Sequence, residues 1–139
     1  MIRNVFSVVG LYVALLLPMS AHAADELAAY IDVAGAPGDG KEALERGLSN
    51  RLLDRGFTIS SKPVVNAYEI QGFVRLSPAD RGKETIRIDW MVFGPDGTRL
   101  GNMTQTRVIR KGSLNRRWGS TAEAAAEAAA QDIFKYLPQ

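Results

Sequence analysis

Apolar and polar residues alternate with a period of two along three stretches of the second half of the chain, residues 68–76, 86–93 and 99–109. In the second stretch, Ile86, Ile88, Trp90 and Val92 alternate with Arg87, Asp89, Met91 and Phe93. This pattern indicates antiparallel strands with one buried face, and it places Trp90 in the core. The motif Gly94–Gly97 (GPDG) predicts a tight turn before the third stretch. Alternation in that third stretch is imperfect, and Gly101 predicts a bulge there.

The first half of the chain predicts two short strands, at 29–33 and 57–59, with a helix between them. Asp39 and Glu42 have the spacing of a capping box at the start of this helix. Gly56 has the position of a residue that ends it. Apolar and small residues at helical spacing predict one buried face, formed by Leu44, Gly47, Leu48 and Leu52.

An alanine-rich segment near the carboxyl end predicts a second helix. Ser120 and Glu123 have the spacing of another capping box, and Pro138 stops the helix. Its buried face is predicted to be Ala122, Ala126, Ala129, Ile133 and Leu137. The order is therefore β-α-β-β-β-β-α. We expect an α+β fold, a two-layer sandwich of a mainly antiparallel sheet with two helices on one face.

The first residues have the pattern of a secretory signal peptide. Arg3 precedes an apolar run at 5–17, and Ala21-His22-Ala23 follows. We expect residues 1–23 to be removed and 24–139 to form a single α+β domain in the periplasm. Retention of the segment as an anchor is the alternative, although the run is shorter than the roughly 20 residues of a spanning helix. No cysteine follows the cleavage site, which argues against a lipid anchor.

Composition narrows the chemistry of the exported chain. The full sequence of 139 residues has no cysteine and a single histidine, and His22 lies in the segment to be removed. Catalysis by cysteine or histidine, Ser-His-Asp triads, and zinc or haem sites built on these ligands are thereby excluded. We predict a protein that is not an enzyme and that has no cofactor or metal.

Charge is distributed unevenly. Residues 98–117 contain six basic residues and no acidic one. We expect this stretch to form a surface that contacts an envelope protein or an anionic envelope component, either lipid or glycan. Nucleic acid is a poor candidate for an exported chain. The candidate contact residues are Arg107, Arg110, Lys111, Arg116, Arg117 and the aromatic Trp118. The alternatives are a solvated strand and loop, and a Trp118 ring that packs over the edge of the core.

The segment Gly35–Glu42 (GAPGDGKE) matches a phosphate-binding loop except at its last position. Glu42 replaces the hydroxyl residue that binds magnesium, and Asp39 places a carboxylate inside the loop. We therefore expect no nucleotide partner, and we interpret the segment as the start of a capped helix.

Two other functions remain open. With 15 acidic residues, a carboxylate-dependent cell-wall hydrolase is an alternative, although no pair stands out. The other alternative is a structural envelope protein that associates with itself, as a homodimer. Phe73, Met91 and Phe93 would then point outward on neighbouring strands and form an apolar patch.

Several strings resemble a largely uncharacterised family of small exported alphaproteobacterial proteins, periplasmic proteins or lipoproteins. They are Ala34–Gly40, Asp89-Trp90, Gly94–Gly97, Gln105, Gly112–Leu114 and Trp118-Gly119. The resemblance implies export and brings no assigned activity, and this chain lacks the lipobox cysteine of the lipoproteins. The predicted strand order is also similar to that of lipopolysaccharide-assembly lipoproteins, an analogy of fold that does not carry function.

Overall fold

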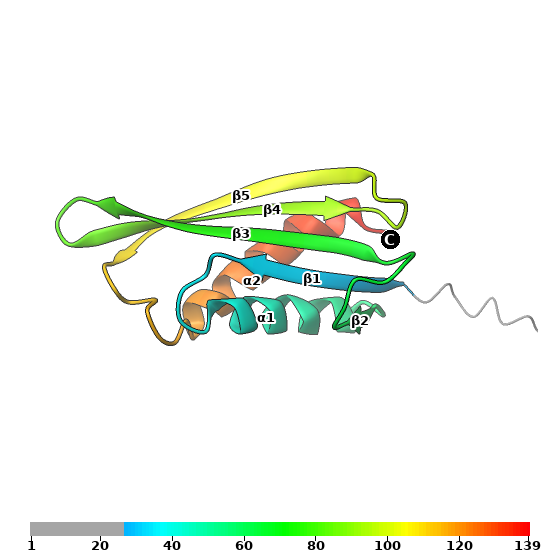
Figure 1. Cartoon of the computed structure of the whole chain (residues 1–139), viewed down its shortest axis with the longest axis horizontal. Helices are drawn as coiled ribbons and strands as arrows, with labels where there is room; N and C mark the ends of the chain where they lie inside the picture. Colours follow the sequence, from blue (N-terminus) through cyan, green and yellow to red (C-terminus); the bar gives the residue numbers. More distant parts are fainter. Residues whose placement is uncertain (1–26) are drawn as a thin grey trace, which may run out of the picture.

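The computed structural model describes residues 27–139, which form one five-stranded sheet with both helices on the same face (Figure 1). The elements are β1 (Ala28–Ala34), α1 (Gly40–Asp54), β2 (Thr58–Ser60), β3 (Tyr68–Ala79), β4 (Lys83–Phe93), β5 (Arg99–Arg110), α2 (Ser120–Ile133) and a 3₁₀ turn, η1 (Phe134–Tyr136). The predicted α+β class and element order are confirmed. The predicted signal peptide lies outside the described residues. Between residues 27 and 139, no helix is long and apolar enough to cross a membrane.

The sheet is mixed, with the strand order β2-β1-β3-β4-β5. The three long strands β3, β4 and β5 form an antiparallel meander. In contrast, β1 lies between β2 and β3 and runs parallel to both. Most of the strand pairing in the sheet is therefore antiparallel, as predicted, but the parallel pairing of β1 was not predicted. It arises because α1 returns the chain to the starting end of the sheet, as in a β-α-β unit.

The core lies between the sheet and the two helices. Both predicted helix faces are buried, including Leu44, Leu48 and Leu52 on α1 and Ala126 and Ile133 on α2. Trp90 is fully buried at the centre, as predicted. A Cβ on Gly72 would lie 2.8 Å from the Trp90 ring, so glycine at this position makes room for the indole.

The predicted irregularity at Gly101 is present. Val92 pairs with Gly101 and Phe93 with Arg99, so Leu100 is an extra residue in β5. A Cβ on Gly101 would collide with the ring of Tyr136. The glycine therefore both marks the bulge and lets the carboxyl-terminal turn pack against β5.

The predicted capping boxes are wrong. The cap positions are Asp39 and Gly119, and neither makes a side-chain hydrogen bond to its helix. The Asp39 carboxylate is bound to a different segment, described below, and Ser120 is already the first residue of α2. At the other end of α1, Gly56 has a φ of 90°, which is consistent with the predicted role of glycine in ending the helix.

Candidate functional site

The loop that precedes α2 is held against the loop that precedes α1 by three hydrogen bonds. The backbone N–H of Asp39 donates to the carbonyl of Arg116 at 2.7 Å. The Asp39 carboxylate accepts from the backbone N–H of Trp118 at 2.8 Å, and the Trp118 indole donates to the carbonyl of Pro37 at 2.8 Å. We call this contact between residues 37–39 and 116–118 the clasp. It fixes the position of the loop that carries Arg116 and Arg117.

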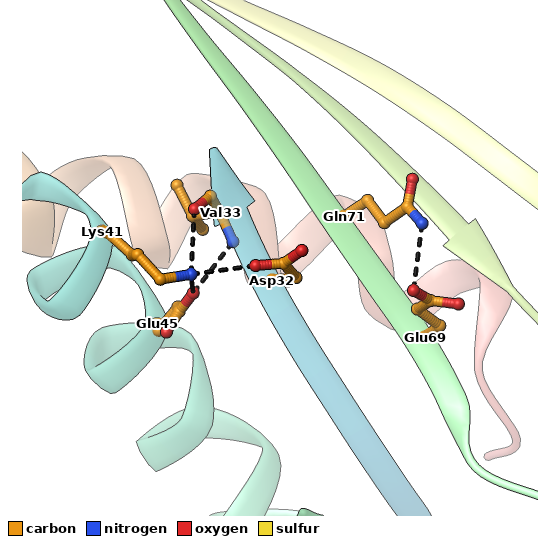
Figure 2. A network of polar contacts seen from close by, with 6 residues as sticks. All are labelled: Asp32, Val33, Lys41, Glu45, Glu69 and Gln71. Carbon is orange, nitrogen blue, oxygen red and sulfur yellow. Dashed lines mark hydrogen bonds and ion pairs between the residues drawn. The ribbon is translucent and has the colours of Figure 1, made fainter. Parts of the chain in front are cut away.

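Glycines in the first loop make this close approach possible. A Cβ on Gly38 would collide with the carbonyl of Arg116, and a Cβ on Gly40 would collide with the Trp118 ring. Packing against Trp118 therefore explains Gly40, the second glycine of the pattern that resembles a phosphate-binding loop. Lys41, the lysine of the pattern, is already ion-paired. Its ammonium lies 2.9 Å from a carboxylate oxygen of Asp32 and 2.7 Å from one of Glu45 (Figure 2).

Trp118 is not a surface aromatic. Only 2% of this residue is exposed, and its indole N–H is bound within the clasp. Its prediction as a contact residue is therefore wrong. The alternative expectation is confirmed, because the ring packs at the edge of the core and fixes the loop.

The clasp, the turn between β3 and β4, and the end of β5 lie at the same end of the molecule (left in Figure 1), and each of these segments contains basic residues. Lys83 and Arg110 lie directly opposite each other on β4 and β5. The backbone N–H of Lys111 donates to the carbonyl of Gly82, which holds the turn and the loop together. We call Lys83, Arg110, Lys111, Arg116 and Arg117 the basic end. Lys83 was missed in the sequence because it joins the others only through the strand register.

Within residues 27–139, no ion pair neutralises a cation of the basic end. The basic partners of the six ion pairs in the described part of the chain are Lys41, Arg51, Arg75, Arg87 and Lys135, all outside the basic end. The nearest acidic group along β4, Glu84, accepts a hydrogen bond from the backbone N–H of Gly112 at 3.2 Å. All five side chains of the basic end belong to exposed residues.

Arg107 is separated from the basic end by the alternation of the strand. It lies opposite Ile86, on the helix-facing side of β5, whereas Arg110 lies on the open side. There it lines a hollow of about 200 Å³ between α2 and strands β4 and β5. The prediction that Arg107 forms one surface with the other cations is therefore corrected, because Arg107 lies on the opposite side of the strand from Arg110.

A second hollow, of about 360 Å³, lies beside the clasp and is lined by two arginines, Arg46 and Arg117, and two carboxylates, Asp39 and Glu123. Both carboxylates already have partners. Asp39 accepts the Trp118 N–H, and Glu123 is ion-paired with Arg51 at 3.3 Å.

The face of the sheet away from the helices carries the predicted apolar residues Phe73, Met91 and Phe93. Phe73 is 42% exposed, and the other two are half-buried. Beside Phe73, Asp89 accepts hydrogen bonds from Thr104, Arg87 and Arg75. The Thr104 hydroxyl, followed by the two guanidinium groups, holds the pKa of the Asp89 carboxyl below its usual value.

Groups of three or more potential metal ligands are absent from residues 27–139. No family model matches the chain, and no curated protein matches it.

The chain is similar to several solved structures, among them the following three. A minor lipoprotein from Acinetobacter baumannii is 14% identical, with a TM-score of 0.43 over 78% of this chain and 92% of that chain. Lipoprotein GNA1162 from Neisseria meningitidis is 11% identical, with a TM-score of 0.45 over 78% and 99%. An uncharacterized protein is 13% identical, with a TM-score of 0.43 over 78% and 86%.

Proposed function

We propose that this protein is an exported, non-catalytic accessory module of the cell envelope that binds phosphate-bearing envelope components through its basic end. The observation that carries the proposal is the set of exposed cations without ion-pair partners at one end of the described fold. Like charges held close together repel one another, and an anionic partner relieves this repulsion. Lipid headgroups and phosphorylated glycans both offer such phosphates.

The clasp and the strand register support this function because they fix the backbone of the residues that carry the cations before binding. Arg116 and Arg117 lie on a loop that is bonded to the start of α1, and Arg110 and Lys83 lie on paired strands. Positions fixed in advance lower the ordering cost of association. Export is supported by the pattern of the first 23 residues.

The test compares binding to vesicles of phosphatidylglycerol and phosphatidylethanolamine (1:3), to neutral phosphatidylcholine vesicles, and to a soluble phosphorylated oligosaccharide. We expect binding to a phosphate-bearing probe that weakens as salt rises. Serine at Lys111, Arg116 and Arg117 should weaken it about tenfold or more, since each cation near an anionic surface contributes roughly 1 kcal/mol.

The matched control carries serine at Lys62, Arg99 and Lys135, three exposed cations outside the basic end. It has the same net charge as the test variant and should bind almost as well as the unmodified protein. Equal loss in the two variants, or no salt-dependent binding to either phosphate-bearing probe, would overturn the proposal.

A second candidate function, a carboxylate-dependent cell-wall hydrolase, is favoured by one observation, the presence of Asp39 and Glu123 in the same hollow. The test is release of soluble fragments from labelled peptidoglycan by the protein and by Asp39→Asn and Glu123→Gln variants. Release that depends on both residues would establish the hydrolase and contradict the non-catalytic proposal.

A further inference from the structure

The outer edge of β5 is a long, open strand edge. β5 is the last strand of the sheet order, spans 12 residues, and pairs with β4 only. In residues 27–139, no backbone-to-backbone hydrogen bond outside the β4 ladder involves residues 99–109. Such an edge is a template for pairing with another strand.

At the opposite edge of the sheet, side chains cover the exposed backbone. Where β2 ends, the backbone N–H of Val33 is bound by Glu45 and its carbonyl is bound by Lys41 (Figure 2). Side chains of α1 therefore cover the exposed part of β1. The described chain has no comparable backbone cover along the outer edge of β5.

A hollow lies directly beside this open edge. Its walls are α2 and the helix-facing side of β4 and β5, and its lining residues include Ile86, Ile88, Gln105, Arg107, Ala125 and Ala128. Both ends of the Gln105 amide already have a partner, because the oxygen accepts from the Trp90 indole and the nitrogen donates to the carbonyl of Ala125. The hollow is smaller than the 300–1,000 Å³ of whole small-molecule sites. It has a size suited to a single apolar side chain.

Charge indicates what kind of strand fits. β5 contains Arg99, Arg107 and Arg110 and no acidic residue, and Arg107 lines the hollow. Pairing of two copies through β5 would bring six arginines together. An acidic strand brings opposite charge instead, since opposite charges across paired strands are favourable and like charges are not.

We propose that the open edge of β5 receives an extended acidic segment of a partner protein as a sixth strand. One apolar side chain of the segment fills the hollow under α2, and an acidic side chain two positions away faces Arg107. Main-chain hydrogen bonds supply affinity, and the hollow selects the side chain. This inference goes beyond the proposed function, because it uses the strand edge and the hollow instead of the basic end.

The probe is an acetylated, amidated heptapeptide, Thr-Glu-Thr-Phe-Thr-Glu-Thr, whose glutamates and phenylalanine share one face in either strand direction. We expect it to bind and to slow hydrogen exchange at alternate amides of β5, because only one edge of the strand gains partners. Absence of binding, or binding without protection in β5, would overturn the proposal.

Two N-methylated versions separate strand addition from simple charge attraction. One carries methyl groups on the threonine nitrogens and the other on the glutamate and phenylalanine nitrogens, so each has one edge blocked. Strand addition predicts that one version binds like the parent and the other binds at least tenfold more weakly. Equal binding of both would show contact through side chains alone and would overturn the proposal.

Variants of the protein test the hollow. Ala128→Leu adds a side chain at an exposed position of α2 that lines it, and should weaken binding about tenfold, the equivalent of 1.4 kcal/mol. Gln131→Leu is the control, since it adds a leucine at an exposed position of α2 outside the hollow. Arg107→Gln should weaken binding several-fold. Equal effects of the two leucine variants would contradict the proposal, as would β5 amides protected by a second copy when no peptide is present.

Discussion

The carboxylate of Glu45 accepts a hydrogen bond from the backbone N–H of Val33 at 2.9 Å, so a helix side chain acts as the strand partner of β1. The short strand β2 pairs with residues 28–30 only. Lys41 completes the arrangement, because its ammonium donates to the carbonyl of Val33 and to both Glu45 and Asp32 (Figure 2). The two carboxylates raise the pKa of Lys41 above its usual value, the Glu45 hydrogen bond contributing most.

Glu45→Ala should destabilise the fold by about 1–2 kcal/mol, because it leaves the Val33 N–H without its protein partner. Glu45→Gln keeps an acceptor for this N–H and should cost less. The free energy of unfolding, measured in urea, checks both values. Glu127→Ala, at an exposed position of α2, is the control and should change stability by less than about 0.5 kcal/mol. Equal losses in the Glu45→Ala variant and this control would contradict the role given to Glu45.

Asp39→Ala should destabilise the fold by about 1–2 kcal/mol, whereas Glu42→Ala should have little effect. Asp39 holds the backbone N–H of Trp118 in the clasp, and Glu42 does not complete the capping box that the sequence suggests. Urea unfolding monitored by tryptophan fluorescence measures both. A capping box would make the two losses similar, which is the result that would refute this interpretation.

Asp89 should contribute stability that depends on pH. Its folded pKa is lowered below the usual value of 3.8, so the contribution is fully present above about pH 4 and is lost as the pH falls through the folded pKa. Asp89→Asn should therefore cost about 1 kcal/mol at pH 7 and progressively less in stronger acid.

Urea unfolding at pH 7, 4 and 2.5 measures this difference. Asp80→Asn, in the turn between β3 and β4, is the comparison variant. A stability gap between Asp89→Asn and the unmodified protein that stays constant across the three pH values would rule out the expected linkage.

The expectation of self-association through the open face is tested with Phe73→Ser, at the most exposed of the three apolar residues on that face. If this patch joins two copies, light scattering at rising concentration should show a dimer for the unmodified protein and a monomer for the variant. Leu53→Ser, at an exposed apolar residue of α1 and therefore in the helix layer on the other side of the sheet, is the control. A monomer at every concentration, or a dimer that persists in Phe73→Ser, would exclude an interface that depends on Phe73.

The elements and the core of this fold were predictable because the signals are local. The alternation around Trp90 and the helical spacing of Leu44, Leu48 and Leu52 each depend on neighbouring residues, and all four side chains are buried. The parallel pairing of β1 was not predictable in the same way, since it depends on the path of α1 across the sheet.

The candidate site was predicted less completely, because it depends on contacts between distant segments. The sequence left two positions open for Trp118, a contact surface or the edge of the core, because its partners Pro37 and Asp39 lie about 80 residues earlier in the chain. Lys83 joins Arg110 through strand register alone. The separation of Arg107 from Arg110 could have been predicted from the sequence, because odd and even positions of a strand face opposite sides.

The central place of β1 has a consequence for the order in which the sheet is assembled. β1 is synthesised before the other strands of residues 27–139, yet one of its two neighbours, β3, is complete only at Ala79. Until then β1 has at most the three-residue strand β2 beside it, whereas β3, β4 and β5 pair with the strands next to them in the chain. Because local pairings form faster than distant ones, we expect the meander to form first and β1 to insert beside it afterwards. In that order of assembly, the backbone groups of β1 stay open to pairing with other chains until the meander is in place.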